Sequence, residues 1–381
     1  MNQGFYLTLM MGSFIASPVP QAVIDALSEV QVTSTVGSQG GFQLKFTMAR
    51  NSPLTMLHES GFFNPRQRVV IAVTVNGSTE VLMDGIVTKQ DMTPSSQAGK
   101  SALTITGIDL TALMDFIDFT GIPYLAVPTF VMVEMCLAKY LPLGVVPVAI
   151  PAFPLFVEPP TDGYYKQQGT DYEFVTTLAS DAKVPVLGGW TFYLDPGPKP
   201  GMSIAYWGPD ISKLFPAMQP ALSINLDATT NIDSINFSYD GTLATNYIAM
   251  VIEPNTKVPI PIPLPSIDFI KAPYAAHAPT PLKYKQFYPG AGKGIVEGLV
   301  DVVGKLMETA DVISGSGQLD VLRYGHVFKA RQLATVRGAG NYYDGKYYVK
   351  SVTHNIKRGE YKQSFTLSRG GTGSSVSTVD I

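Results

Sequence analysis

The chain has 381 residues and a net charge of −3, with only 15% charged residues against 45% hydrophobic ones. This length predicts two or more domains, the charge balance argues against a nucleic-acid binder, and the scarcity of charge indicates a surface largely covered by partners in a permanent assembly. The single cysteine, Cys136, excludes an internal disulfide and favours folding in a cytoplasm.

Strand patterns fill residues 1–117. Their number is typical of a small barrel or sandwich. The predicted strands are Phe5–Met10, Val30–Ser34, Phe42–Met48, Arg68–Val75, Val81–Lys89 and Ala102–Thr106. Asp109 is expected to cap a short helix that ends near Ile117.

Neither a signal peptide nor a membrane span is predicted. The apolar start has no charged residue ahead of its hydrophobic run, because the first Lys or Arg is Lys45. The longest uncharged apolar stretch, Leu141–Val157, contains four prolines, which a membrane helix would tolerate poorly.

Residues 118–220 predict an α+β middle domain. Helices are expected at Thr129–Leu141 and Asp171–Ala182. The second helix opens with a capping box, in which Thr170 and Glu173 satisfy each other's backbone amides. The segment Trp190–Trp207 indicates two strands around a turn rich in Pro and Gly.

Strand patterns return in residues 221–256 and 321–369, which together predict a second barrel. The strands expected there are Ser223–Leu226, Ile232–Tyr239, Thr245–Ile252, Lys346–Ile356 and Tyr361–Leu367. The second barrel would match the first in size, which indicates an internal duplication. The expected fold is therefore α+β and mainly β, with two similar small β-barrels, an α+β middle domain, a helical insertion and a flexible tail at residues 370–381.

The insertion spans residues 257–320. Val258–Pro265 has proline at every second position, so one edge of this segment has no amide donors, and an edge strand or polyproline II is expected. A proline-rich ligand for a signalling domain is the alternative. A helix is predicted over Gly294–Ile313. The candidate partner-interface residues are Val258, Ile260, Ile262, Leu264, Leu299 and Leu306.

No catalytic, cofactor-binding or metal-binding residue is predicted. The four histidines, including His354, stand at no metal-ligand spacing from one another, and His354 is expected to be a surface or hydrogen-bonded strand residue. The segment Gly290–Gly294 imitates a phosphate-binding loop, but Gly294 stands where a Ser or Thr is required.

Four segments carry a family resemblance. They are GGFQLKF at Gly40–Phe46, LTITGIDLTALMD at Leu103–Asp115, GTDYEFVTTLASDAKVPV at Gly169–Val186 and YYDGKYYVKSVTHNIKRGEYKQSFTLSR at Tyr342–Arg369. In this order they resemble the hub proteins of contractile phage tails and related injection machines. That group includes the late-control protein D family and the hub portion of type VI secretion spike proteins.

The resemblance implies that both barrels are of the tail-tube type and that the chain is a structural baseplate protein, not an enzyme. It further implies a homotrimer that joins a sixfold inner tail tube to a threefold central spike and contacts other baseplate proteins, without a cofactor. Because the sequence ends in GGTGSSVSTVDI, a separate spike protein is expected. The alternative is a tail-associated cell-wall hydrolase, which predicts a monomer with a polar cleft.

Overall fold

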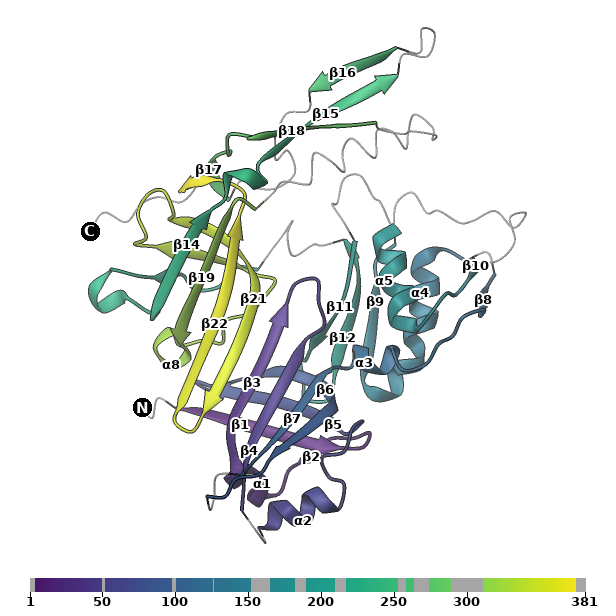
Figure 1. Cartoon of the computed structure of the whole chain (residues 1–381), viewed down its shortest axis with the longest axis vertical. Helices are drawn as coiled ribbons and strands as arrows, with labels where there is room; N and C mark the ends of the chain where they lie inside the picture. The colour runs from purple at the N-terminus through teal and green to yellow at the C-terminus, as the bar shows by residue number, and fades with distance from the viewer. Residues whose placement is uncertain are drawn as a thin grey trace.

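The computed structural model describes residues 4–49, 52–97, 101–125, 127–151, 165–181, 190–209, 217–252, 258–263, 274–288 and 311–374. Its largest feature is a thirteen-stranded sheet, to which both ends of the chain contribute (Figure 1). We call the part built from residues 5–109 the first half-sheet and the part built from residues 222–369 the second half-sheet.

Each half-sheet has six strands. The first contains β1 (Phe5–Gly12), β3 (Leu27–Thr35), β4 (Gly41–Met48), β5 (Arg68–Val75), β6 (Ser78–Thr93) and β7 (Ser101–Asp109), with β2 (Ser17–Pro18), α1 (Gln21–Ala26) and α2 (Pro53–Glu59) beside them. The second contains β13 (Leu222–Ser223), β14 (Ser234–Tyr239), β19 (Ile313–Asp320), β20 (Leu333–Arg337), β21 (Gly345–Lys357) and β22 (Glu360–Arg369), with the short helices η3 (Asp227–Thr229) and α8 (Val321–Tyr324).

The two half-sheets share one strand order. Across the sheet the strands follow β3-β4-β7-β6-β5-β1 in the first and β14-β19-β22-β21-β20-β13 in the second. Ranked by position in the chain, both orders are second, third, sixth, fifth, fourth, first. Neighbours pair antiparallel throughout, except that β13 runs parallel to β20 whereas β1 runs antiparallel to β5. The predicted mainly-β fold with two similar β regions is confirmed.

A backbone irregularity is repeated in the two half-sheets. β6 has a β-bulge after Val87 and β21 has one after Val349. The carbonyl before each bulge accepts the N–H of an arginine, at 2.8 Å from Arg66 and 3.0 Å from Arg331. Both arginines have left-handed backbones, with φ of 75° and 63°, and each is followed by glutamine. This repeated Arg-Gln pair is a sign of duplication that the sequence analysis overlooked.

The two half-sheets are joined edge to edge. The part of β21 that follows its bulge pairs antiparallel with β3, from Ser351 opposite Thr35 to Lys357 opposite Glu29. The described ladders thus connect the two regions and do not close either one on itself. Each half-sheet covers an edge of the other that would otherwise expose unpaired backbone groups.

The core lies on one face of the sheet, as the alternating sequence predicts. Leu44 and Phe46 of β4 are fully buried, while Gln43 and Lys45, which precede them, are exposed. On β21, Val352 and Ile356 are buried in the same cluster of apolar residues. Each such side chain contributes about 1.5–3 kcal/mol when it leaves water, so this cluster stabilises both halves together.

Strand β19 contradicts the sequence-based expectation of a helix up to Ile313 and of no strand before residue 321. The strand has the sequence ISGSGQLD, and Gly and Ser are rare in strands. Here the glycines are needed, since a Cβ on Gly315 would lie 3.0 Å from the Phe237 ring and one on Gly317 would lie 2.6 Å from the Phe365 ring. The rest of that predicted helix lies outside the described residues.

The insertion forms a separate sheet that projects beyond the main one (Figure 1). It contains β15 (Thr245–Ile252), β16 (Pro259–Pro263) and β18 (Lys283–Phe287), in the order β16-β15-β18. β15 was expected in the second barrel, but it pairs with β16 and β18. β16 is an edge strand, as its prolines predict. Next to the insertion, β17 (Ala275–His277) pairs with β23 (Thr372–Ser374) near the C-terminus.

The middle domain packs helices against a three-stranded sheet. Its elements are α3 (Thr111–Met114), β8 (Pro123–Tyr124), α4 (Thr129–Leu137), η1 (Ala138–Leu143), β9 (Val145–Ala149), β10 (Tyr165–Lys166), α5 (Asp171–Asp181), β11 (Trp190–Pro196) and β12 (Ser203–Pro209). The capping box of α5 is confirmed: the Thr170 N–H donates to Glu173 at 3.0 Å and the Glu173 N–H donates to Thr170 at 3.2 Å. The helix predicted over Thr129–Leu141 is α-helical only to Leu137 and continues as the 3-10 helix η1. Pro142 in η1 has no N–H for an α-helical hydrogen bond.

Candidate functional site

The predicted interface residues lie only partly in the described chain. Val258, Ile260 and Ile262 lie on or next to the projecting strand β16 and are 56%, 47% and 45% exposed. Leu264, Leu299 and Leu306 lie outside the described residues. A role of these side chains in partner binding stays a prediction.

His354 is buried at the junction of the half-sheets, where it lies opposite Val32 of β3. Its Nδ1 is 2.8 Å from the hydroxyl of Tyr361 and 3.1 Å from the side-chain nitrogen of Gln363. Burial lowers the pKa of His354 to about 3, so its ring is neutral in the folded chain. This residue is a hydrogen-bonded core histidine, one of the two outcomes expected from its strand.

Acid is expected to destabilise the fold through His354. Its pKa rises from about 3 in the folded chain to 6.5 on unfolding, so the unfolded chain binds an extra proton between those values. Stability therefore falls as the pH drops below 6.5, by about 1.4 kcal/mol per pH unit from this group. Urea unfolding from pH 7 to pH 5 should show a steeper loss for the native chain than for His354→Gln. Equal slopes would mean that the ring can be protonated in place.

A buried ion pair connects the first half-sheet to the middle domain. Arg68 of β5 donates two hydrogen bonds to Asp84 of β6, at 2.8 and 2.7 Å, and their side chains are 7% and 0% exposed. The guanidinium also donates to the carbonyls of Phe14 at 3.1 Å and Gly201 at 3.0 Å. Burial raises the pKa of Asp84, and the bonds from Arg68 oppose that rise. All four hydrogen bonds of Arg68 are made within the chain, so the ion pair holds the first half-sheet to the turn at Gly201 in the middle domain.

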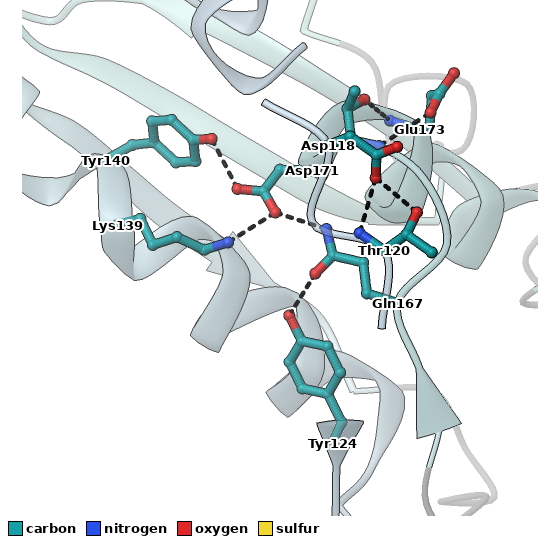
Figure 2. A network of polar contacts seen from close by, with 9 residues as sticks. Asp118, Thr120, Tyr124, Lys139, Tyr140, Gln167, Asp171 and Glu173 are labelled. Atoms are coloured by element: carbon teal, nitrogen blue, oxygen red, sulfur yellow. Dashed lines mark hydrogen bonds and ion pairs between the residues drawn. The ribbon is translucent and has the colours of Figure 1, made fainter. Parts of the chain in front are cut away.

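A second polar network surrounds Asp171 at the start of α5 (Figure 2). Its buried carboxylate accepts hydrogen bonds from Lys139 at 2.7 Å, from Tyr140 at 2.7 Å and from Gln167 at 2.8 Å. The Gln167 carbonyl in turn accepts from the Tyr124 hydroxyl at 3.0 Å. The carboxylate thus joins α5 to η1, which follows α4, and to the loop before α5. The sequence identified Asp171 only as the first residue of a helix.

A cavity of 210 Å³ lies between the first half-sheet and the middle domain, and Asp109, Tyr172 and Arg331 are among its lining residues. Asp109 accepts the Gly40 N–H at 2.6 Å and the Thr111 N–H at 3.0 Å, so it satisfies the first amide of α3, although the N-cap residue of that helix is Leu110, one position after the expected cap. Among the described residues, no cluster of three or more His, Cys, Asp or Glu could hold a metal ion. No helix in the described ranges is long and apolar enough to span a membrane.

The strand β14 and the part of β6 after its bulge each have an open edge in the part of the chain that the structure describes. β14 pairs with β19 on one side only, and β6 after its bulge pairs with β7 on one side only. These edges carry exposed large side chains, with Met92 51% exposed and Tyr239 38% exposed. Open edges of this kind bind further strands unless they are protected.

The face of the main sheet that points away from the core is polar. It carries hydroxyl and amide side chains that are exposed or half-buried, among them Gln31, Thr33, Gln43, Thr104, Thr106, Ser314, Ser316, Thr353, Asn355, Ser364 and Thr366. Charges of both signs lie among them, with Lys45, Lys89, Lys357 and Lys362 beside Glu29, Asp91, Asp320 and Glu360. Because these charges balance, the face offers no strong net charge to a passing molecule.

The fold is similar to solved tail proteins. The tail protein from Neisseria meningitidis MC58 aligns with a TM-score of 0.57 and 10% identity, over 96% of this chain and 97% of that one. The 43 kDa tail protein of prophage MuSo2 from Shewanella oneidensis aligns with a TM-score of 0.59 and 11% identity, over 96% and 98%. The chain has the fold of these tail proteins. The resemblance drawn from four sequence segments is thereby confirmed at the level of the fold.

A chain of the Francisella PdpA–VgrG complex shares the fold as well. It aligns with a TM-score of 0.57 and 9% identity over the whole of the present chain, which spans 60% of the Francisella one. No family model and no curated protein matches the sequence. The likeness therefore lies in the arrangement of strands and not in conserved residues.

Proposed function

We propose that this protein is a structural hub of a contractile tail or tail-like injection particle. As a homotrimer it joins the sixfold inner tail tube to the threefold central spike. It folds in the bacterial cytoplasm and then becomes part of the assembled particle. Its partners are the central spike protein, the tube protein and other baseplate proteins.

The observation that carries this proposal is the shared strand order of the two half-sheets. A trimer of such chains offers six similar units in a ring, which can meet a sixfold tube without strain, while the trimer as a whole keeps threefold symmetry for a spike. We accordingly assign residues 1–117 to one tube-like unit, residues 118–220 to the middle domain, and residues 221–256 with 321–369 to the second unit. In this division we count β15 with the insertion, because it pairs with β16 and β18. We count β19 with the second unit, because it pairs with β22.

Two surfaces support the same proposal. The polar face of the main sheet, on which charges of the two signs balance, suits the wall of a channel through which other molecules pass. The exposed apolar residues Val258, Ile260 and Ile262 on the projecting sheet suit contacts with baseplate neighbours. The alternative, a cell-wall hydrolase, would need carboxylates that are free to act on a substrate. The buried carboxylates of Asp84, Asp109 and Asp171 instead accept hydrogen bonds from their own chain.

The proposal is tested by native mass spectrometry of the full chain, alone and with the spike protein of the same particle. We expect three copies of the chain per complex and three copies of the spike. Electron microscopy of the same sample should show a ring with six similar lobes on the face opposite the spike. A chain that stays monomeric at tens of micromolar, with and without spike protein, would contradict the proposal.

A further inference from the structure

The open edge of β14 has none of the features that protect an edge strand. β16, the edge of the projecting sheet, has prolines at alternate positions, so its outer side has no amide donors. β14 has the sequence SINFSY, without proline, charge or bulge. A strand of this composition with one free side is a ready template for pairing.

The duplicated topology shows which strand fits this edge. We start from the valine before each bulge and follow the residues that pair with it on successive neighbouring strands. This gives one series of residues for each half-sheet, and the two series correspond position by position. The first runs Val87, Gly107, Phe42, Val32, and the second runs Val349, Leu367, Gly315, Phe237. β14 is therefore the counterpart of β3, and the part of β6 after its bulge is the counterpart of the same part of β21.

Those counterparts already pair inside the chain, because β21 binds β3. We propose that β14 of one copy pairs antiparallel with residues 89–93 of β6 in the next copy, in the register of the β3–β21 junction. The equivalent of Thr353 opposite Thr33 is then Asp91 opposite Ser238, and the equivalent of His354 opposite Val32 is Met92 opposite Phe237. The proposed function supplies the number of copies, three, on which this inference rests.

The exposure of the edge residues agrees with this pairing. Met92 is 51% exposed, whereas its counterpart His354 is 5% exposed because β3 covers it. Phe237 is only partly buried, whereas its counterpart Val32 is fully buried. The pairing would place the side chains of Met92 and Phe237 against each other and remove both from water.

Charged residues fit the same register. At the existing junction Arg331 donates to the Ser34 hydroxyl at 3.3 Å and to the Thr35 carbonyl at 3.2 Å. Its counterpart Arg66 is exposed, and the counterpart of Thr35 is Asp240, also exposed. Arg66 and Lys89 of the next copy would thus face the carboxylate of Asp240 in the first copy. The new contact would bring two cations to an anion, whereas Arg331 at the β3–β21 junction meets the neutral carbonyl of Thr35.

The pairing is heterologous, since each copy offers two different edges, and such contacts close into a ring when the rotation allows. Each copy would contribute eight strands to the ring, from β14 through β21 to β3 and on to β6. The polar face of the main sheet would line this ring continuously. Pro94 has no N–H and ends the new ladder directly after Thr93.

Disulfide trapping of the full chain tests the register. The double variant Asp91→Cys with Ser238→Cys should form, on mild oxidation, a covalently closed ring that runs as a trimer on a non-reducing gel. The template supports the geometry, because the hydroxyl oxygens of Thr33 and Thr353 are 3.1 Å apart. The native Cys136 is buried and does not compete.

Two matched variants calibrate this result. Thr33→Cys with Thr353→Cys should form a bond within one chain, and Asp91→Cys with Phe237→Cys, displaced by one residue, should form none. If the chain is trimeric by mass and the Thr33–Thr353 variant cross-links while the Asp91–Ser238 variant does not, the pairing is wrong and the proposed hub still stands. A strictly monomeric chain overturns both.

A charge exchange tests the same contact without cysteines. Arg66→Glu and Asp240→Arg should each weaken association by about tenfold, and the double variant should recover most of that loss. Sedimentation velocity on the full chain measures it. If the double variant associates no better than the single variants, Arg66 and Asp240 do not meet.

Discussion

Arg68→Ala is expected to lower the free energy of unfolding by about 3–5 kcal/mol. The substitution leaves Asp84 buried without its guanidinium, and it also removes the donors to the carbonyls of Phe14 and Gly201. Because Gly201 belongs to the turn between β11 and β12, the contact of the middle domain with the first half-sheet should loosen. Urea unfolding followed by circular dichroism and tryptophan fluorescence reports both effects.

The control for this experiment is Arg323→Ala, which removes an arginine of an exposed ion pair. Arg323 lies 2.7 Å from Asp233, and its side chain is 50% exposed, so the loss should stay below about 1 kcal/mol. The double variant Arg68→Met with Asp84→Leu should recover much of the stability, because apolar residues of similar volume need no partner. If Arg68→Ala and Arg323→Ala lower the free energy of unfolding by similar amounts, the ion pair of Arg68 and Asp84 is solvated and not buried.

Asp171→Ala is expected to destabilise the middle domain by about 3 kcal/mol. The carboxylate is fully buried and accepts three hydrogen bonds, so its loss leaves Lys139, Tyr140 and Gln167 without their acceptor. Both tryptophans of the chain, Trp190 and Trp207, lie in this domain. Their fluorescence in urea therefore reports the domain directly.

Glu173→Ala is the matched comparison, because it alters the same helix terminus at its exposed capping box. It should cost about 1 kcal/mol, the usual effect of a lost cap. Asp171→Asn should fall between the two, since the amide keeps an acceptor but presents a donor to Lys139. Equal effects of Asp171→Ala and Glu173→Ala would show that the network adds nothing beyond capping.

The sequence by itself determined those elements whose cause is local. The β-branched run Arg68–Val75 is strand β5 with the predicted limits, and the capping box at Thr170 starts α5. The alternate prolines of β16 confine it to an edge, because they cannot donate to a second neighbour. In each case the information lies within a few residues of the feature, so a single sequence is enough to read it.

Only the tertiary structure decided the features that depend on distant partners. β19 is a strand because the rings of Phe237 and Phe365 cover its glycines, and those residues lie on other strands. His354 is buried because β3 lies beside it, more than three hundred residues earlier in the chain. Strand pairing across such separations follows from the packing of whole surfaces, so no local pattern encodes the joined edges on which the proposed assembly depends.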